Sequence, residues 1–298
     1  MTKLRSKARV KARMGMFFTL PGLIFVIAFM IYPLFTSLYY SFTNYNYVYD
    51  VKPIFNGFQN YIAAFQDETF VLTIKNTLVF ASTFFVSVMI LGLVTALLLF
   101  YFKGKDNLYK TLIFMPIVVP LSLAAILFNW IFAENFGLLN FIIGDVFKLT
   151  QFTYGWLTNR VTAMGAIVSV TTWSSLGFIT ILFLAGLQGI SGDILEAAKI
   201  DGAGTIGTIF KIILPNLRET YVITGIWAIL RGLKIYAPPV VMTGGAPGNA
   251  TRVMYMHIYD NAFEFFEMGY ASALGFILSV IVLSISFVNL KINSSKGD

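Results

Sequence analysis

The sequence predicts an all-α membrane protein that crosses the bilayer six times. Of the 298 residues, 57% are hydrophobic and only 12% are charged, whereas about a quarter of the residues in a soluble domain are charged. The apolar residues gather in windows close to the roughly 20 residues that a helix needs to cross the hydrocarbon core. The expected membrane-spanning helices are 16–40, 73–101, 111–133, 161–190, 219–242 and 268–290.

The first window follows a basic stretch, KLRSKARVKAR at residues 3–13, and in this respect imitates a secretory signal peptide. Its apolar run is much longer than the roughly 7–15 residues of a signal-peptide core, and no small-residue cleavage site closes it. We therefore expect a retained membrane anchor.

Lys and Arg are distributed unevenly among the connections between the windows. With the N-terminus in the cytoplasm, the cytoplasmic segments hold fourteen of these residues and the outer segments five, while Arg231 and Lys234 fall inside the fifth window. Because cytoplasmic connections of membrane proteins are enriched in Lys and Arg, the sequence predicts that both termini are cytoplasmic. The net charge of +7 is therefore explained by the membrane topology, and nucleic acid is not an expected partner.

Composition argues against several other classes of protein. The chain has no cysteine and a single histidine, His257, which excludes disulfides, thiolate metal sites and multi-histidine metal centres. A membrane enzyme would need a cluster of catalytic side chains or metal ligands at one depth. A channel or an ion-coupled secondary transporter would need acidic residues or histidines within its spans, and only Glu219 falls in a window, at its edge.

Prolines interrupt several windows, among them Pro116 and Pro120 in the third and Pro238 and Pro239 in the fifth. Such breaks are tolerated in membrane helices where they are buried in protein or line a cavity. They therefore indicate either a transport pathway or kinks that improve helix packing.

The connection at 191–217, between the fourth and fifth windows, encodes two short helices with a sharp turn between them. Asp193 followed by Glu196 is the pattern of a capping box at a helix start. Gly202, which follows Asp201, is expected to end the first helix because glycine accepts left-handed backbone angles.

The second of these short helices is amphipathic and is expected to stop at Pro215. Its apolar stripe, at helical spacing, is formed by Ile206, Ile209, Phe210 and Ile213. Such a helix needs an apolar surface, which is either the membrane interface or a groove in a partner protein. The segment has few basic residues and no tryptophan, so docking onto a partner protein is the favoured interpretation.

The same connection resembles, at uninterrupted spacing, the EAA loop in the membrane subunits of binding-protein-dependent ABC importers. The resemblance is carried by Glu196-Ala197-Ala198, Asp201-Gly202-Ala203, Phe210, Ile213 and Leu214-Pro215. In that family the loop is a coupling helix that sits in a cleft of the ATP-binding subunit. The resemblance thus implies that the residues coupling to the ATPase are Glu196, Ala197, Ala198, Asp201, Gly202, Ala203, Phe210, Ile213 and Pro215.

The resemblance extends over nearly the whole chain. It includes GFQNYIAAF at 57–65, MPIVVPLSLAAILFNWIF at 115–132, FLAGLQGI at 183–190, TGGAPGNAT at 243–251 and YMHIYDNAF at 255–263. These stretches are similar to carbohydrate importers, and more narrowly to the first permease of maltodextrin and glycerol-3-phosphate importers. The resemblance implies a complex with a second homologous permease subunit, two copies of an ATP-binding subunit and an external solute-binding protein, in the bacterial cytoplasmic membrane.

The apolar windows, the charge pattern and the resemblance together divide the chain into segments. A basic cytoplasmic N-terminus at 1–15 precedes the first membrane helix and its outer loop at 16–72. The permease core extends over 73–290 and contains the cytoplasmic coupling loop at 191–217, and a cytoplasmic tail follows at 291–298. The implied function is translocation of a sugar or oligosaccharide by alternating access. No catalytic residue and no cofactor are expected in this chain, since ATP and Mg²⁺ belong to the partner ATPase.

The stretch TGGAPGNAT at 243–251 superficially resembles a phosphate-binding loop. A P-loop requires Lys followed by Ser or Thr at its end and a strand before it, and neither is present here. We therefore expect a structural turn at the outer mouth of the fifth span.

Arg231 and Lys234 are three residues apart and therefore on one helix face. Counted from the start of the fifth window at residue 219, at 1.5 Å per residue, Arg231 lies about 18 Å into the membrane. A charge at that depth usually faces a cavity or a partner. The two cations either line the pathway and contact substrate hydroxyls or carboxylates, or form an ion pair or carbonyl contact with the partner permease. Tyr236-Ala237 stands where the family commonly has Phe-Asp, and Arg231 is an additional cation, so acidic sugars and glycerol phosphates stay open as cargo.

Tryptophans and short polar side chains occur together in the middle of two windows. SVTTWSSLGF at 169–178 surrounds Trp173 with Thr and Ser, and Asn129 precedes Trp130 in the third window. Sugar rings stack on indoles and their hydroxyls need short polar partners, but Ser and Thr in membrane helices also serve close packing. The candidate pathway residues are therefore Asn129, Trp130, Trp173, Ser174, Trp227, Arg231, Lys234 and Tyr236.

Overall fold

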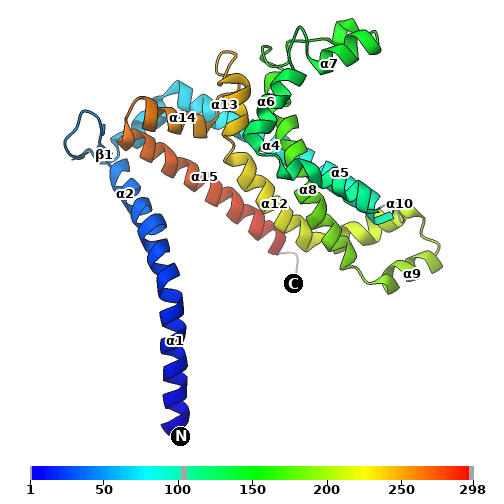
Figure 1. The fold of residues 1–298 in the computed structure, drawn as a ribbon, viewed down its shortest axis with the longest axis horizontal. Helices are drawn as coiled ribbons and strands as arrows, with labels where there is room; N and C mark the ends of the chain where they lie inside the picture. The colour runs from blue at the N-terminus through cyan, green and yellow to red at the C-terminus, as the bar shows by residue number, and fades with distance from the viewer. Residues whose placement is uncertain (1, 102–105, 295–298) are drawn as a thin grey trace. The chain divides into compact units, whose positions relative to one another are not determined.

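The computed structural model describes residues 2–101 and 106–294 (Figure 1). Its helical elements begin with α1 (Thr2–Val26), the π-helix η1 (Ile27–Ile31), α2 (Tyr32–Ser41), α3 (Gln59–Gln66), α4 (Glu68–Tyr101), α5 (Asp106–Val118), α6 (Leu121–Ile131) and α7 (Leu138–Phe141). They continue with the π-helix η2 (Ile142–Val146), the 3-10 helix η3 (Thr150–Phe152), α8 (Ala163–Gln188), α9 (Gly192–Ile200) and α10 (Thr205–Thr208). The remaining helices are η4 (Ile209–Ile213), α11 (Leu214–Asn216), α12 (Arg218–Leu233), α13 (Ala237–Thr243), α14 (Met254–Tyr259), η5 (Asp260–Glu264) and α15 (Met268–Ser294).

Two short strands complete the described fold, β1 (Thr43–Asn44) and β2 (Ile54–Phe55). They pair antiparallel, with Thr43 opposite Phe55. The rest of the regular structure is helical, so the all-α class is confirmed. The predicted cytoplasmic connection at 102–105 and the end of the predicted tail at 295–298 lie outside the described residues.

Within the described ranges, four helical segments are long and apolar enough to cross a membrane. They are Met14–Ser41, Glu68–Tyr101, Ala163–Gln188 and Met268–Asn289. These segments coincide with the first, second, fourth and sixth predicted windows, because each window supplies the roughly 20 apolar residues that a crossing needs.

The third window does not form the single straight span that was predicted at 111–133. Its two helices, α5 and α6, meet at an angle of 101°. Proline has no N–H and disfavours helical geometry in the residue before it. Pro120 stands at the start of α6 in an extended conformation, with a ψ of 132°, and the bend therefore falls just before it.

The fifth window, predicted at 219–242, is also broken. The helix α12 ends at Leu233, and α13 begins at Ala237 after a short non-helical segment. Pro238 and Pro239 lie in the first turn of α13 and lack the N–H groups that would continue the hydrogen bonds of α12. Neither half is long enough to cross alone, so the count of six spans stays a prediction.

The chain forms two compact units. The first contains the described residues up to Gln66 together with Ile258–Ile277, and the second contains Asp67–His257 and the described residues from Leu278 onward. Residues 258–277 thus belong to the first unit.

Inside the first unit, the hairpin region is held by side chains that bond to backbone. Asn60 Nδ2 donates to the carbonyl oxygens of Ser41 and Thr43, at 3.0 and 2.9 Å. The N–H of Gly269 donates to the carbonyl oxygen of Tyr45 at 3.0 Å. A Cβ at Gly269 would collide with the carbonyl oxygen of Thr43, so this close approach requires glycine.

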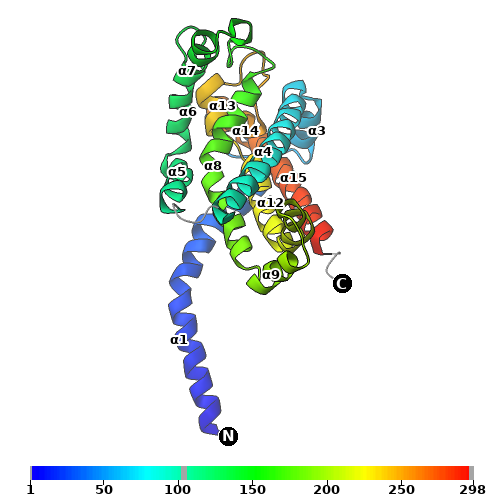
Figure 2. The same cartoon turned by 90° about the vertical axis from the view of Figure 1, so that its right-hand side faces the viewer.

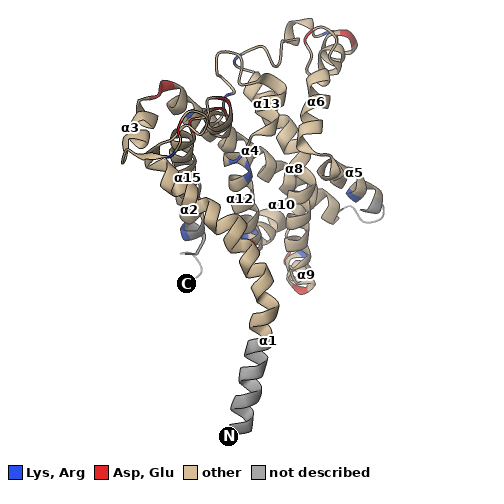
Figure 3. Ribbon diagram, turned by 60° about the vertical axis from the view of Figure 1, so that its left-hand side comes forward, with Lys and Arg blue, Asp and Glu red and all other residues tan. Residues whose placement is uncertain are grey.

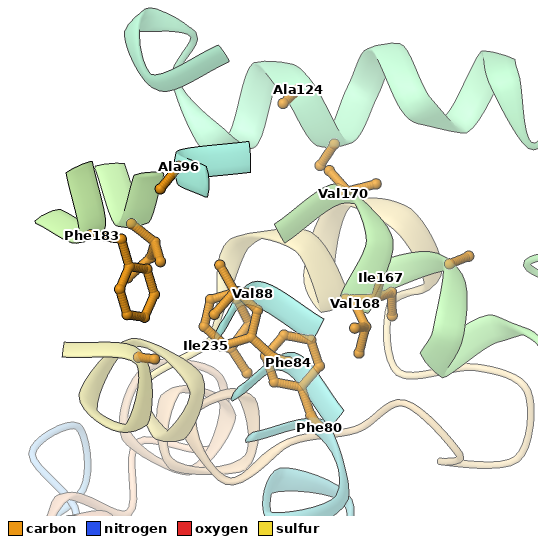
Figure 4. Packing of buried hydrophobic residues seen from close by; sticks show 14 of the residues in the cluster. Phe80, Phe84, Val88, Ala96, Ala124, Ile167, Val168, Val170, Phe183 and Ile235 are labelled. Atoms are coloured by element: carbon orange, nitrogen blue, oxygen red, sulfur yellow. The ribbon is translucent and has the colours of Figure 1, made fainter. Parts of the chain in front are cut away.

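The core of the second unit lies mainly between α4 and α8. Figure 4 shows Phe80, Phe84 and Val88 of α4 in the same cluster as Ile167 and Val168 of α8. Lipid tails are as apolar as these side chains, so such helices associate through close packing and interhelical hydrogen bonds. One such bond joins the hydroxyls of Thr95 in α4 and Thr180 in α8, whose oxygens are 2.6 Å apart.

The two long connections of the second unit lie at opposite ends of α8. In Figures 1 and 2, α7 stands at one end of this helix and α9 at the other. Figure 3 shows that α8 and α15 are largely uncharged, while charged residues lie in connections and on α9. The candidate coupling and outer segments are therefore separated by the length of α8.

Candidate functional site

The candidate coupling segment begins with α9, whose ends are fixed by local sequence. Ser191 is the N-cap, and its side chain accepts a hydrogen bond from the N–H of Asp193 at 3.3 Å. The sequence predicted a capping box that starts at Asp193, whereas the N-cap in the structure is Ser191, two residues earlier. A serine hydroxyl caps as well as an aspartate, and Asp193 lies instead in the first turn, where its negative charge suits the helix dipole.

The C-terminal end of α9 depends on one glycine, as predicted. Gly202 has a φ of +76°, the left-handed conformation. The N–H of Ala203 donates to the carbonyl oxygen of Ala198 at 2.9 Å, and that of Gly202 donates to Lys199 at 3.1 Å. These two bonds form a Schellman motif, which satisfies carbonyl groups that the helix end would leave unbonded.

The second half of the segment differs from the predicted amphipathic helix. The chain passes from α10 through the π-helix η4 into α11, so Pro215 does not stop the helical path. Proline lacks an N–H, and it lies in the first turn of α11, where a missing donor is tolerated. The predicted single stripe is divided, since Ile213 is buried with 0% exposure whereas Ile206 is 74% exposed.

Several large apolar side chains of this segment face outward. The exposed fractions are 86% for Ile200, 74% for Ile206 and 66% for Phe210. Exposed apolar clusters rimmed by charges are typical of protein interaction sites. Of the nine predicted coupling residues, Ala198 and Ile213 are buried inside this chain, which removes these two from the candidate contact surface.

Two of the predicted pathway residues, Arg231 and Trp227, lie together. The Cζ atom of Arg231 is 5.3 Å from the centroid of the Trp227 ring, within cation–π range. Arg231 Nε donates a hydrogen bond of 3.0 Å to Ser175 Oγ on α8. The ring of Trp227 in turn lies 4.7 Å from that of Phe178. We name these four residues the Arg231 cluster.

Sequence reasoning missed Ser175 and Phe178 as members of the Arg231 cluster. Their three-residue spacing on α8 puts them on one helix face. In the sequence, the Thr and Ser residues of this stretch surround Trp173, and Ser174 is the predicted pathway residue. Without knowledge that α8 packs on α12, no local signal selects Ser175 over the neighbouring hydroxyls.

The other predicted pathway residues are not members of this cluster. The ring of Trp173 lies 5.2 Å from that of Phe128, and Ser174 is buried. Asn129 Nδ2 donates to the carbonyl oxygen of Val241 at 3.1 Å, which joins α6 to α13. Tyr236 is half-buried beside another aromatic ring, and Lys234 is exposed at the end of α12. The predicted residues are thus several local groups and not one site.

The last of them, Trp130, borders a cavity of about 1020 Å³ at the end of α6. Its lining also includes Glu134, Phe136 and Asp145. Asn140 holds this region together, because its side chain donates to the carbonyl oxygens of Glu134 and Tyr154, both at 2.9 Å. The cavity belongs to the predicted outer side and lies away from the Arg231 cluster.

The TGGAPGNAT stretch follows a helix, α13, and ends it through Gly244 in the left-handed conformation. Asn76 Nδ2 donates to the carbonyl oxygens of Asn249 and Arg252, at 2.8 and 2.9 Å. The loop is therefore attached to the first turns of α4.

Comparison with known proteins agrees with this architecture. A family model described as "Binding-protein-dependent transport system inner membrane component" matches residues 88–295. The probable ABC transporter permease protein YurN of Bacillus subtilis is 30% identical over 281 residues, covering 92% of this chain and 94% of that one. SmoG of Agrobacterium fabrum, a sulfoquinovosyl glycerol transport system permease protein, is 31% identical over 277 residues, covering 93% and 89%.

A solved structure shows the same fold. One chain of a bacterial ABC transporter involved in the import of the acidic polysaccharide alginate matches with a TM-score of 0.84 at 19% identity, covering 100% of both chains. The family model spans well over half of the sequence, and the relatives extend along almost all of it. The chain therefore belongs to the family of inner membrane components of binding-protein-dependent transport systems, as a multi-pass permease of an ABC importer.

Proposed function

We propose that this permease translocates a sugar or oligosaccharide that an external solute-binding protein delivers. Its relative SmoG serves a sulfoquinovosyl glycerol transport system, and aromatic rings beside short hydroxyl side chains on α8 suit such a cargo. Family membership supports the solute-binding partner. The remaining partners in this proposal are a second homologous permease and two copies of an ATP-binding subunit. The ATP-binding subunits hold the ATP and Mg²⁺.

The observation that carries the coupling role is the ordered, outward-facing apolar surface on α9, α10 and η4. We define the coupling surface as Glu196, Ile200, Ile206 and Phe210, all of which are exposed. An amphipathic segment of this kind suits a groove in a partner protein. Ala198 and Ile213 hold the segment against its own chain, since both are buried.

The position of the segment explains how a movement would reach the pathway. It connects the end of α8 to the start of α12, and these two helices touch where a Cβ at Gly186 would collide with Thr220. Ser175 and Arg231, which bond to each other, lie further along the same two helices. A displacement of the coupling surface by a closing ATPase would therefore shift both helices together, as alternating access requires.

The test is purification of the complex in mild detergent, with the amount of bound ATPase as the readout. Phe210→Asp should reduce ATPase retention by about tenfold or more, because a charge replaces an anchor in an apolar contact. The matched control is Phe136→Asp, since Phe136 is similarly exposed, at 77% against 66% for Phe210, but lies near the other end of α8. This control should retain the ATPase.

Gly202→Asp is a second variant, which should release the ATPase for a different physical reason. A residue with a Cβ is strained at the φ of +76°, so this change should disturb the turn after α9 and also release the ATPase. If no ATPase accompanies the unmodified chain, or if both variants keep it, the proposed function is wrong.

A further inference from the structure

Among the residues that the structure describes, Arg231 has no anionic partner. Only Glu219 among the 14 acidic residues falls in a predicted span, and it precedes Arg231 by twelve residues, about 18 Å along a helix. In the described ranges, the hydrogen bond of Arg231 goes to the neutral Ser175, and no carboxylate is paired with it. A charge within a membrane-spanning segment is unfavourable unless it meets an anion, a partner or water.

The surroundings hold the guanidinium in one orientation. Its Nε donates to Ser175 Oγ at 3.0 Å, and Ser175 is only 2% exposed, so this acceptor is fixed. One face of the group lies over Trp227, which is itself packed against Phe178. These contacts occupy the Nε position and one face, and they leave the edge with Nη1 and Nη2 for another molecule.

That edge has the chemistry of an oxyanion receptor. Two parallel N–H groups of an arginine match the two oxygens of a carboxylate, or two oxygens of a sulfonate, with specific geometry. A neutral sugar offers only hydroxyl dipoles, which compensate the charge less well. The Arg231 cluster is therefore better suited to an anionic ligand than to a neutral one.

We propose that Arg231 selects cargo by charge, binding the carboxylate or sulfonate of an acidic sugar as it passes the Arg231 cluster on α8 and α12. The inference rests on the proposed function and narrows the cargo from sugars in general to sugars with a negative charge. Lys234, exposed at the end of α12, adds a second positive charge near the break between α12 and α13. Two other anions offer similar chemistry, the phosphate of a phosphate-ester cargo and a carboxylate of the second permease. The experiment distinguishes both of them from an acidic sugar.

The experiment measures uptake by the complete complex in proteoliposomes, with its solute-binding protein, of acidic and neutral probes matched in size. The pairs are trigalacturonate with its full methyl ester, and sulfoquinovosyl glycerol with glucosyl glycerol; glycerol 3-phosphate is a separate probe. We expect the wild type to prefer one acidic sugar over its neutral counterpart by about tenfold or more. Arg231→Gln should bring this ratio to about one, because it removes the guanidinium charge but leaves the transport pathway open.

Two further variants distinguish binding from structure. Arg231→Lys should restore part of the preference, since it keeps the charge without the bidentate geometry. Lys75→Gln, the loss of an exposed cation on α4 that is not among the candidate pathway residues, should lower the ratio by no more than about twofold.

The inference is overturned if Arg231→Gln leaves the ratio unchanged, if the wild type prefers the neutral probes, or if only glycerol 3-phosphate is taken up. It is also overturned if Arg231→Gln releases the second permease during purification, which would identify Arg231 as a structural partner in the assembly. A wild-type complex that retains its ATPase but imports none of the sugars would contradict the sugar cargo of the proposed function, and this inference with it.

Discussion

At the scale of single residues, Asp67 anchors the start of α4 within the second unit. Its Oδ1 accepts hydrogen bonds from the N–H groups of Thr69 and Phe70, at 2.8 and 3.2 Å. Its Oδ2 lies 3.0 Å from Nε2 of His257, whose ring stacks on that of Phe70. One carboxylate thus caps α4 and attaches it to α14.

The pKa of Asp67 follows from these contacts. Burial raises the pKa, but the hydrogen bond from Phe70, the charge of His257 and the bond from Thr69 outweigh it, so the net pKa lies below the ordinary value of 3.8. A lowered folded-state pKa means that Asp67 stabilises the fold above about pH 3.8 and that this contribution disappears as the pH falls through the folded pKa.

We therefore expect Asp67→Ala to lower the stability of the complex by about 1–2 kcal/mol near neutral pH, mainly through loss of the cap. The difference in Tm between wild type and variant should hold down to about pH 5 and shrink below about pH 4. The measurement is the Tm of both proteins over a series of pH values. A difference that widens as the pH falls below 4 would show that the carboxylate is not stabilised in this way.

At the scale of elements, close contact between helices depends on small residues. A Cβ at Gly177 of α8 would lie 2.7 Å from the carbonyl oxygen of Ile113 and 3.0 Å from the Cα of Phe114, both in α5. Backbone atoms cannot turn aside as a flexible side chain can. Gly177 therefore sets the distance between α8 and α5, in the way that small residues do in membrane helix pairs.

Gly177→Ala should destabilise the protein by about 1–3 kcal/mol, the range for overpacking a close contact. Gly165→Ala is the matched control, since Gly165 is on the same helix and a Cβ there meets nothing within 4 Å. The control should be neutral or stabilising by up to about 1 kcal/mol, because alanine favours helix more than glycine does. Thermal unfolding of both variants provides the comparison, and equal Tm values would contradict the close α5–α8 contact.

At the scale of the whole molecule, the predicted topology puts the outer cavity region and the coupling surface on opposite sides of the membrane. The excess of Lys and Arg in the predicted cytoplasmic segments sets the direction. The structure places the two regions at opposite ends of α8 (Figure 1). The orientation with both termini inside therefore assigns the coupling surface to the cytoplasm.

The absence of cysteine from the sequence makes this orientation directly testable. Phe136→Cys, at a position that is 77% exposed, and Ile200→Cys, at one that is 86% exposed, each introduce a single thiol. A membrane-impermeant maleimide added to intact cells should label the Phe136→Cys protein. The Ile200→Cys protein should react only after permeabilisation. The reverse pattern would overturn the predicted orientation.

The sequence by itself determined the features that depend on local composition. Apolar length located the helices α4, α8 and α15, because any crossing segment must cover the hydrocarbon core with residues that are contiguous in the chain. The turn at Gly202 was equally readable, since one residue without a Cβ decides the backbone conformation there. The family resemblance of the 191–217 connection likewise rested on contiguous residues.

Tertiary structure decided what depends on segments far apart in the sequence. Arg231 and Ser175 are separated by 56 residues and meet only because α12 packs beside α8. The prolines of the third window indicated a break, but not the 101° between its halves. Ile213 is buried and Phe210 exposed because η4 departs from the 3.6-residue period that the stripe assumed. Local rules act over a few residues, and packing between distant helices selects which side chains meet.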